Sequence, residues 1–165
     1  MTETKSVSET YILFEIAGTT YAVASQSVQQ VEMITHLTPL PNAPRFVEGV
    51  VFTRGQVIPA LNLRARFGFD RVPLTTRTRL IVTNFDGRVV GLIVDSAREF
   101  MAIAAEAIQP PPQSMASVSG RYLKGIITIG DRLVLLVSID QILDIDPERV
   151  NPVDGGNYGS SKAQQ

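Results

Sequence analysis

Residues 46–63 read FVEGVVFTRGQVIPALNL, and residues 122–139 repeat the pattern without a gap as YLKGIITIGDRLVLLVSI. Each copy begins aromatic, aliphatic, charged, glycine, aliphatic, and then passes through a glycine-bearing turn into a second apolar run. Two such runs joined by a short turn indicate a β-hairpin, with tips at Arg54-Gly55 and Gly130-Asp131. Glycine supplies the positive φ that a tight hairpin turn requires.

A second pair of similar segments stands in the same order in both halves. Residues 23–31 (VASQSVQQV) correspond to residues 92–100 (LIVDSAREF). The distance along the chain between these two segments is seven residues shorter than the distance between the two hairpin segments. Two matched blocks in one order indicate an internal duplication, although two unrelated hairpins could also look alike. A duplicated unit has a seam between its copies, so an apolar groove between two small subdomains is the first binding site to expect.

The composition limits the class of protein. The chain has 165 residues, 44% hydrophobic residues, a formal net charge of −1 and no cysteine. It can bury a real core, while disulfides and thiolate chemistry are excluded. The near-zero charge argues against nucleic-acid binding. The absence of a long apolar run predicts no membrane insertion, and the polar residues 1–10 lack the pattern of a signal peptide, so we expect a cytoplasmic protein.

Short strands with turn punctuation dominate the remaining sequence. Residues 11–16 and 21–23 flank Ala17-Gly18, and residues 80–83 and 89–94 flank Asp86-Gly87, a strong hairpin signal. The sequence predicts a mainly β fold of two five-stranded barrels related by duplication, spanning residues 11–149. Residues 1–10 and 150–165 are expected to be flexible tails. One short C-terminal helix is expected after Ser138, started by a Ser138–Gln141 capping box and stopped by Pro147.

Catalytic and metal-binding groups are sparse. His36 is the sole histidine, and it lies beside threonine and leucine rather than near potential ligands. The GxSxG, GxxxxGK[ST] and GxGxxG patterns are missing, and the carboxylates are scattered. We therefore expect no enzymatic activity, no metal site and no cofactor.

One arginine is in an unusual place. Arg54 occupies the tip of the first hairpin, where the second copy has Gly130, and its neighbours are small or apolar. A guanidinium held at a rigid turn can reach a carboxylate or carbonyl of a partner with little entropy left to lose. The alternative is an ordinary solvated turn arginine. Arg64 and Arg66 follow at strand spacing and are predicted to form a solvated rim.

Val28, Val31 and Ile34 form a second candidate surface. In residues 25–31 (SQSVQQV), Val28 and Val31 stand among uncharged polar residues. A mixed surface of this kind can pair with a protein without desolvating charges. An ordinary half-buried strand would have the same pattern.

These motifs together resemble the CheW family of chemotaxis coupling proteins over residues 11–145. Residues 46–64 are similar to the family signature F-[IV]-x-G-V-x-N-L-R-G-x-[IV]-[IV]-P-V-x-D-L-R, and residues 88–95, 122–125 and 130–132 match its later motifs. The chain departs from the signature at Phe52-Thr53, where Asn-Leu is usual, and at Asn62, where aspartate is usual.

The resemblance implies two SH3-like barrels with a shared hydrophobic interface and no catalysis. It implies an adaptor that joins the cytoplasmic tip of methyl-accepting chemoreceptors to the regulatory domain of a CheA-type histidine kinase, at the membrane-associated array. Arg54 matches the arginine needed for coupling, Gly49 the glycine ahead of it, and Val28 a receptor-contacting valine. With Val31, Gly55 and Val57 beside them, these residues form the predicted partner-binding set.

The mechanism expected from this set is purely geometric. An apolar groove between the barrels would accept the receptor's helical hairpin with Arg54 at its edge, and a face of the first barrel would meet the kinase. The alternatives are a scaffold of a twitching or developmental pathway, a small-ligand sensor that uses the groove as a pocket, and a nucleic-acid-binding barrel, which the charge disfavours.

Overall fold

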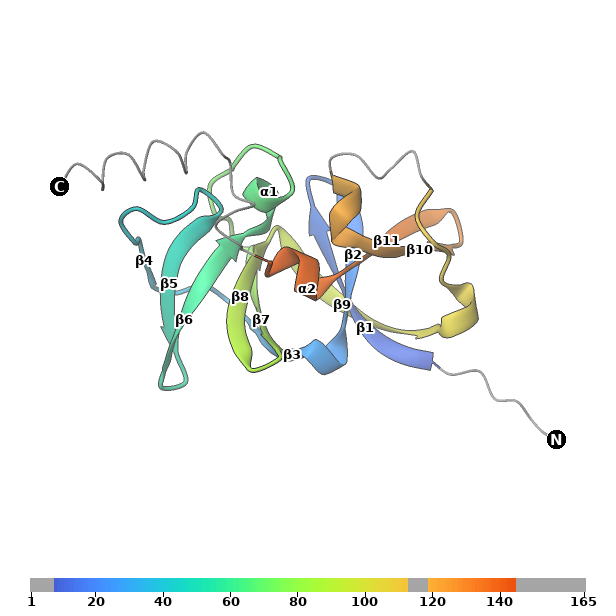
Figure 1. Ribbon diagram of the computed structural model, residues 1–165, viewed down its shortest axis with the longest axis horizontal. Helices are drawn as coiled ribbons and strands as arrows, with labels where there is room; N and C mark the ends of the chain where they lie inside the picture. The colour runs from blue at the N-terminus through green and yellow to red at the C-terminus, as the bar shows by residue number, and fades with distance from the viewer. Residues whose placement is uncertain (1–7, 113–118, 145–165) are drawn as a thin grey trace.

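The computed structural model describes residues 8–112 and 119–144, which form two β-sheets (Figure 1). The first sheet has the strand order β10-β11-β2-β1-β9, with bounds Leu123–Ile129, Arg132–Val137, Thr19–Ala24, Ser8–Ile16 and Ser96–Ala104. The second has the order β3-β7-β8-β6-β5-β4, with bounds Val28–Glu32, Arg79–Phe85, Arg88–Val94, Gln56–Asn62, Val47–Thr53 and Leu37–Thr38. Three 3₁₀ turns interrupt the strands: η1 Ser25–Ser27, η2 Ala105–Ala107 and η4 Ser119–Tyr122.

The two halves of the chain exchange strands. β3 follows β2 in sequence but pairs with β7 in the other sheet, and β9 follows β8 but pairs with β1. Each sheet therefore contains strands from both halves. The predicted mainly β fold of two subdomains is confirmed, and the strand exchange intertwines the two halves. One sheet has the five strands that were predicted, and the other has six because of the short β4.

Each sheet curls until its two edges meet. In the second sheet β3 leads through residues 33–36 into β4, which pairs with β5, and the Thr53 hydroxyl of β5 donates to the Glu32 carboxylate of β3 at 2.9 Å. In the first sheet the chain beyond β9 returns in the same way, because Gln109 forms a bridge with Ile126 of β10. Both subdomains are thus closed by the same device, a strand that continues from one edge of the sheet to the other.

The strand register confirms the duplication in detail. β6 runs parallel to β8 with Ala60 opposite Gly91, and β11 runs parallel to β2 with Leu136 opposite Ala22. These four residues are equivalent pairs under the two sequence matches. Both hairpins also carry a register shift at the repeated glycine, Gly49 or Gly125 in the two copies.

The seam between the barrels is a packed core. Four aromatic rings contact one another in a row across it. The ring centroids are 5.7 Å apart for Phe14–Tyr21, 5.2 Å for Tyr21–Phe67 and 5.3 Å for Phe67–Tyr122. The buried residues of this cluster come from both halves: Ile12, Phe14, Ile16, Tyr21, Val23, Leu61, Leu63, Phe67, Ile81, Val90, Leu92, Val94, Tyr122, Leu123, Ile126, Leu135, Val137, Ile139, Ile142 and Leu143. Apolar side chains at the seam therefore pack against one another in the interior. The predicted groove on the surface above them stays a prediction.

Two short helices stand where the sequence predicted one. α1 (Leu63–Arg66) begins after Asn62, whose side chain accepts a hydrogen bond from the Ala65 amide at 3.0 Å. α2 (Ile139–Ile142) occupies the equivalent place in the second copy. The predicted Ser138–Gln141 capping box does not form, since the Ser138 hydroxyl bonds the Asp140 carboxylate instead of a backbone amide. The expected stop at Pro147 lies outside the described residues.

Arg64 and Arg66 are structural, contrary to the solvated rim that the sequence predicted. Arg64 pairs with the Asp95 carboxylate at 3.0 Å. Arg66 stacks on Phe46 at 4.3 Å and donates to the Ile142 carbonyl at 3.0 Å, so α1 of the first half is tied to α2 of the second. Burial lowers the pKa of the Arg66 guanidinium.

The domain begins earlier than residue 11. β1 starts at Ser8, which lies opposite Ala104 of β9, so three residues assigned to the N-terminal tail belong to the sheet. The rest of that tail and the whole predicted tail 150–165 lie outside the described residues. Within the described part, no helix has the length and apolar character needed to cross a membrane.

Candidate protein-binding surface

The β5–β6 hairpin has one buried and one exposed apolar face. Val51 and Ile58 lie opposite each other and face the barrel core, with exposed fractions of 3% and 2%. The next pair, Phe52 and Val57, faces outward with exposed fractions of 68% and 65%. Strand side chains alternate between faces, so the inward pair is used for the core and the outward pair is left for contact with another molecule.

Arg54 forms the tip of this hairpin. It has φ +51° and is followed by Gly55 at φ +78°, the pattern of a type I′ turn. Arginine at such a φ costs on the order of 1 kcal/mol relative to a residue that tolerates it. Within the described residues the Arg54 side chain makes no hydrogen bond or ion pair, and it is exposed. The fold therefore gives no reason for a charge here.

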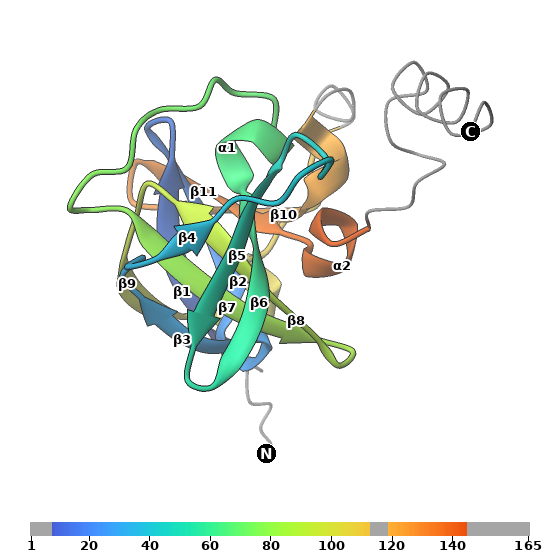
Figure 2. The ribbon, with the colours of Figure 1, turned by 90° about the vertical axis from the view of Figure 1, so that its left-hand side faces the viewer.

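The position of the hairpin corrects a second expectation. Its tip projects away from the seam, at the lower left of Figure 1 and at the bottom of Figure 2. Arg54 therefore does not border the junction between the barrels. The arginine belongs instead to the free end of one barrel, beside the exposed pair Phe52 and Val57.

The two glycines of the predicted set have different roles. A Cβ on Gly55 would meet no atom within 4 Å, so the turn geometry alone calls for glycine there. A Cβ on Gly49 would overlap the Thr38 carbonyl oxygen and lie 2.9 Å from Pro39 Cα. Gly49 is thus required by the close approach of β4, and it supports the candidate surface from within the barrel.

Val28 and Val31 are partly buried and pack against the seam cluster. Residues three apart normally face opposite sides of a strand, but β3 has a bulge: Val28 lies opposite Thr83, Gln30 lies opposite Val82, and Gln29 has no partner. The extra residue shifts the alternation, so both valines face inward. The interpretation as a half-buried strand fits their packing, and the part of each valine left exposed is what a partner could contact.

Glu32 joins these two candidate segments. Both of its carboxylate oxygens accept from the Thr53 hydroxyl, at 3.0 and 2.9 Å, and Oε2 also accepts from Gln30 Nε2 at 2.6 Å. The end of β3 is thereby held beside the residue that precedes Arg54. The sequence prediction did not include Glu32, Thr53 or Phe52, because their proximity depends on the closure of the barrel. Phe52 and Thr53 had a local signal, because they replace the Asn-Leu expected in the motif.

The candidate surface is made of side chains suited to protein contact. Over residues 8–112 and 119–144, no three His, Cys, Asp or Glu side chains gather closely enough to hold a metal ion. The candidate surface instead combines one free guanidinium, one exposed aromatic ring and aliphatic groups. This is the composition of protein-binding hot spots.

Comparison with known proteins decides the family. The protein-family model of the CheW-like domain matches residues 10–146 of the sequence. The chain belongs to the CheW family. It is 31% identical to the chemotaxis protein CheW of Klebsiella aerogenes over 139 residues, covering 84% of each chain. It is 30% identical over 117 residues to protein FrzA of Myxococcus xanthus, covering 71% of this chain and 72% of FrzA.

A solved CheW structure agrees with the fold described above. The crystal structure of the scaffolding protein TtCheW from Thermoanaerobacter tengcongensis superposes with a TM-score of 0.78 at 26% identity, covering 85% of this chain and 95% of that one. The family membership and the two-subdomain β fold predicted from the sequence are thus confirmed for this CheW-family chain.

Proposed function

We propose that this protein is a non-catalytic adaptor of a bacterial chemosensory array, which couples methyl-accepting chemoreceptors to a CheA-type histidine kinase. The observation that carries the proposal is the free, exposed Arg54 at the tip of a hairpin with an outward apolar face, in a chain of the CheW family. An adaptor acts by holding two proteins in register, which requires surfaces rather than reactive groups.

The chemistry of the surface supports protein binding. The ring of Phe52 and the methyl groups of Val57 are already exposed, so covering them with a partner removes apolar area from water. Arg54 stands on a two-residue turn whose backbone is fixed, so its guanidinium can pair with a partner's carboxylate or carbonyl at a limited entropic cost. The apolar pair supplies affinity and the guanidinium supplies orientation.

We assign the receptor and kinase to neighbouring parts of the first barrel. The receptor's helical tip would contact the exposed parts of Val28 and Val31 together with Arg54, which the Glu32–Thr53 hydrogen bonds bring together. The kinase regulatory domain would contact another face of the same barrel, on the cytoplasmic side of the membrane. The similarity of residues 46–64 to the family signature supports this assignment.

Each contact is expected to be weak alone. A single hairpin and one strand edge offer less than a standard interface, so each would bury on the order of 1,200 Å² or less in total. Simultaneous engagement in an array raises the effective concentration and makes the assembly tight.

The match to FrzA favours a second candidate, the same adaptor chemistry in a non-flagellar pathway. The departures at Phe52 and Thr53 lie next to Arg54, and they would adapt the surface to a different receptor or kinase. The departure at Asn62 lies at the other end of the hairpin, where it caps α1.

The proposal can be tested by capture of a purified CheA-type regulatory domain and a receptor cytoplasmic fragment on the immobilised full-length protein. Arg54→Asn is expected to lower the affinity for the receptor fragment at least tenfold. Arg45→Gln is the matched control, since Arg45 is exposed at the opposite end of β5 and loses the same charge. Equal binding of both partners by Arg54→Asn and wild type would refute the assignment.

A further inference from the structure

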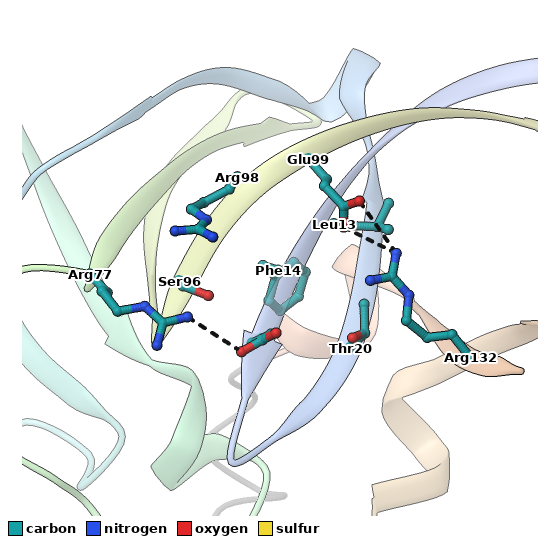
Figure 3. A pocket seen from close by; sticks show the side chains of 9 residues that line it. Leu13, Phe14, Thr20, Arg77, Ser96, Arg98, Glu99 and Arg132 are labelled. Carbon is teal, nitrogen blue, oxygen red and sulfur yellow. Dashed lines mark hydrogen bonds and ion pairs between the residues drawn. The ribbon is translucent and has the colours of Figure 1, made fainter. Parts of the chain in front are cut away.

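A charged cavity of about 410 Å³ lies in the first sheet, remote in sequence from Arg54 (Figure 3). β1, β2, β9, the start of β11 and the loop before β7 supply its lining. The residues that give it its chemistry are Glu15, Arg77, Ser96, Arg98, Glu99 and Arg132.

Arg98 enters this cavity because of a bulge in β9. Leu13 lies opposite Glu99 and Phe14 lies opposite Ala97, so Arg98 is the extra residue without a partner on β1. A bulge redirects the side chain of the residue it inserts. Within the described residues the Arg98 guanidinium makes no hydrogen bond and no ion pair. It is a cation that the strand presents to the cavity and that the protein itself leaves unpaired.

Ser96 adds a second unsatisfied group. The residue has an exposed fraction of 5%, yet no described residue forms a hydrogen bond with its hydroxyl. Figure 3 shows Ser96 between the Arg98 side chain above it and the Arg77 side chain below it, all three among the residues that line the cavity. A buried hydroxyl without a partner normally implies that a ligand or water completes it.

The charges in the cavity do not balance. Arg132 pairs with Glu99 at 3.1 Å, and Arg77 reaches Glu15 only at 3.9 Å. Three guanidinium groups and two carboxylates among the lining residues leave one positive charge without compensation. One carboxylate would neutralise it. A dianionic phosphate would be repelled by both glutamates, so the arrangement favours a monoanion.

The fold does not require this charge. The equivalent strand of the first copy, β3, has the same bulge at Gln29, which the sequence match aligns with Arg98. There the counterparts of Glu99 and Arg132 are the uncharged Gln30 and Gln56. The same backbone forms without charges, so the charges of the second copy have another purpose.

We propose that the cavity is a binding site for a single carboxylate, the side chain of a glutamate or aspartate on a partner protein. Arg98 and Arg77 hold the carboxylate oxygens and the Ser96 hydroxyl donates to one of them. That the carrier is a protein rests on the proposed adaptor function. That the site binds a carboxylate rests on the cavity alone.

The test is an NMR titration of the full-length protein that follows the arginine Nε–Hε signals at constant ionic strength. The probes are the blocked peptide Ala-Glu-Ala, its glutamine analogue and inorganic phosphate. The glutamate peptide is expected to shift the Arg98 and Arg77 signals saturably, and the glutamine peptide is expected to leave them in place. Arg98→Gln is expected to abolish the Arg77 response, while the matched control Arg45→Gln retains both responses.

Three results would overturn the inference: no saturable shift with the glutamate peptide, an unchanged Arg77 response in Arg98→Gln, or tighter binding of phosphate than of the peptide. Each concerns this cavity alone. Capture of kinase or receptor through Arg54 is a separate measurement, so failure here and failure of the adaptor proposal can be told apart.

Discussion

Arg54 has a backbone conformation that suits asparagine or glycine better than arginine. The other two-residue turns with the same geometry have Ala17-Gly18 and Asp86-Gly87, with φ of +51° and +84°, and of +56° and +82°. An exposed arginine at this place adds no bond to the fold of the described residues. The proposed contact with a partner would give this arginine a role.

Replacing Arg54 with asparagine is therefore expected to preserve or improve stability. Asparagine relieves the unfavourable φ, so the free energy of unfolding should rise by up to about 1 kcal/mol, which corresponds to a Tm increase of up to roughly 3 °C. Thermal and urea unfolding followed by circular dichroism measure this. A Tm loss of several degrees would assign Arg54 to the fold instead of to the interface.

Gly49 is expected to behave in the opposite way. An alanine Cβ there overlaps the Thr38 carbonyl, and backbone cannot move away cheaply, so Gly49→Ala should cost about 3 kcal/mol or more. Gly125→Ala is the matched comparison, because its Cβ would meet a side-chain atom, Ile108 Cγ2, at 2.5 Å. Urea unfolding should rank Gly49→Ala as the more destabilising variant, and the reverse order would contradict the packing described for β4.

At the scale of the element, the hairpins and the helix after Ser138 could be predicted from sequence, and α1 could not. Alternating apolar residues around Asp86-Gly87 or Arg54-Gly55 determine both strands and their register. α2 was predictable because Ile139, Ile142 and Leu143 form one apolar stripe after Ser138. α1 has four residues, too few for a helical period to be visible, and its position depends on packing at the seam. Arg66 was misassigned for the same reason: its carbonyl partners at the end of α2 are more than 70 residues away in sequence.

Substitutions of two adjacent residues of β6, Val57 and Ile58, test which face of the hairpin is exposed to solvent. Val57→Ala should change the free energy of unfolding by no more than about 0.5 kcal/mol, because the side chain faces outward. Ile58→Ala should cost about 3 kcal/mol, since Ile58 fills the barrel core. Chemical unfolding of the two variants provides the measurement. Similar losses in both would show that the hairpin face is covered within the monomer.

For the whole molecule, exchange of β3 and β9 makes the two barrels depend on each other. Neither half has a complete sheet alone, and the seam cluster draws on both. The sequence revealed the duplication through matched residues, but pairing across halves leaves no local pattern. The candidate site shows the same limit. Arg54 and Gly55 were recognisable from their turn, whereas Thr53–Glu32 and the charged cavity appear only once β3 and β9 have crossed over.

Unfolding is accordingly expected to be one cooperative transition. Fluorescence of the seam tyrosines and far-ultraviolet circular dichroism should give coincident urea curves. Arg66→Ala removes the carbonyl contacts to α2 and the stacking on Phe46, and it should lower the midpoint without separating the curves. Two resolved transitions in the wild type would show that the barrels are independent units.

The most direct test of the adaptor account is a reconstitution of receptor-dependent kinase activity. A CheA-type kinase and membrane-embedded receptor are combined with wild-type protein, with Arg54→Asn, with Arg45→Gln, or with no addition, and autophosphorylation is followed with and without receptor ligand. The account predicts that ligand controls the kinase with wild type and Arg45→Gln, and that Arg54→Asn gives the uncoupled rate seen without the protein. Ligand control that is equally strong with Arg54→Asn, or without any added protein, would contradict it.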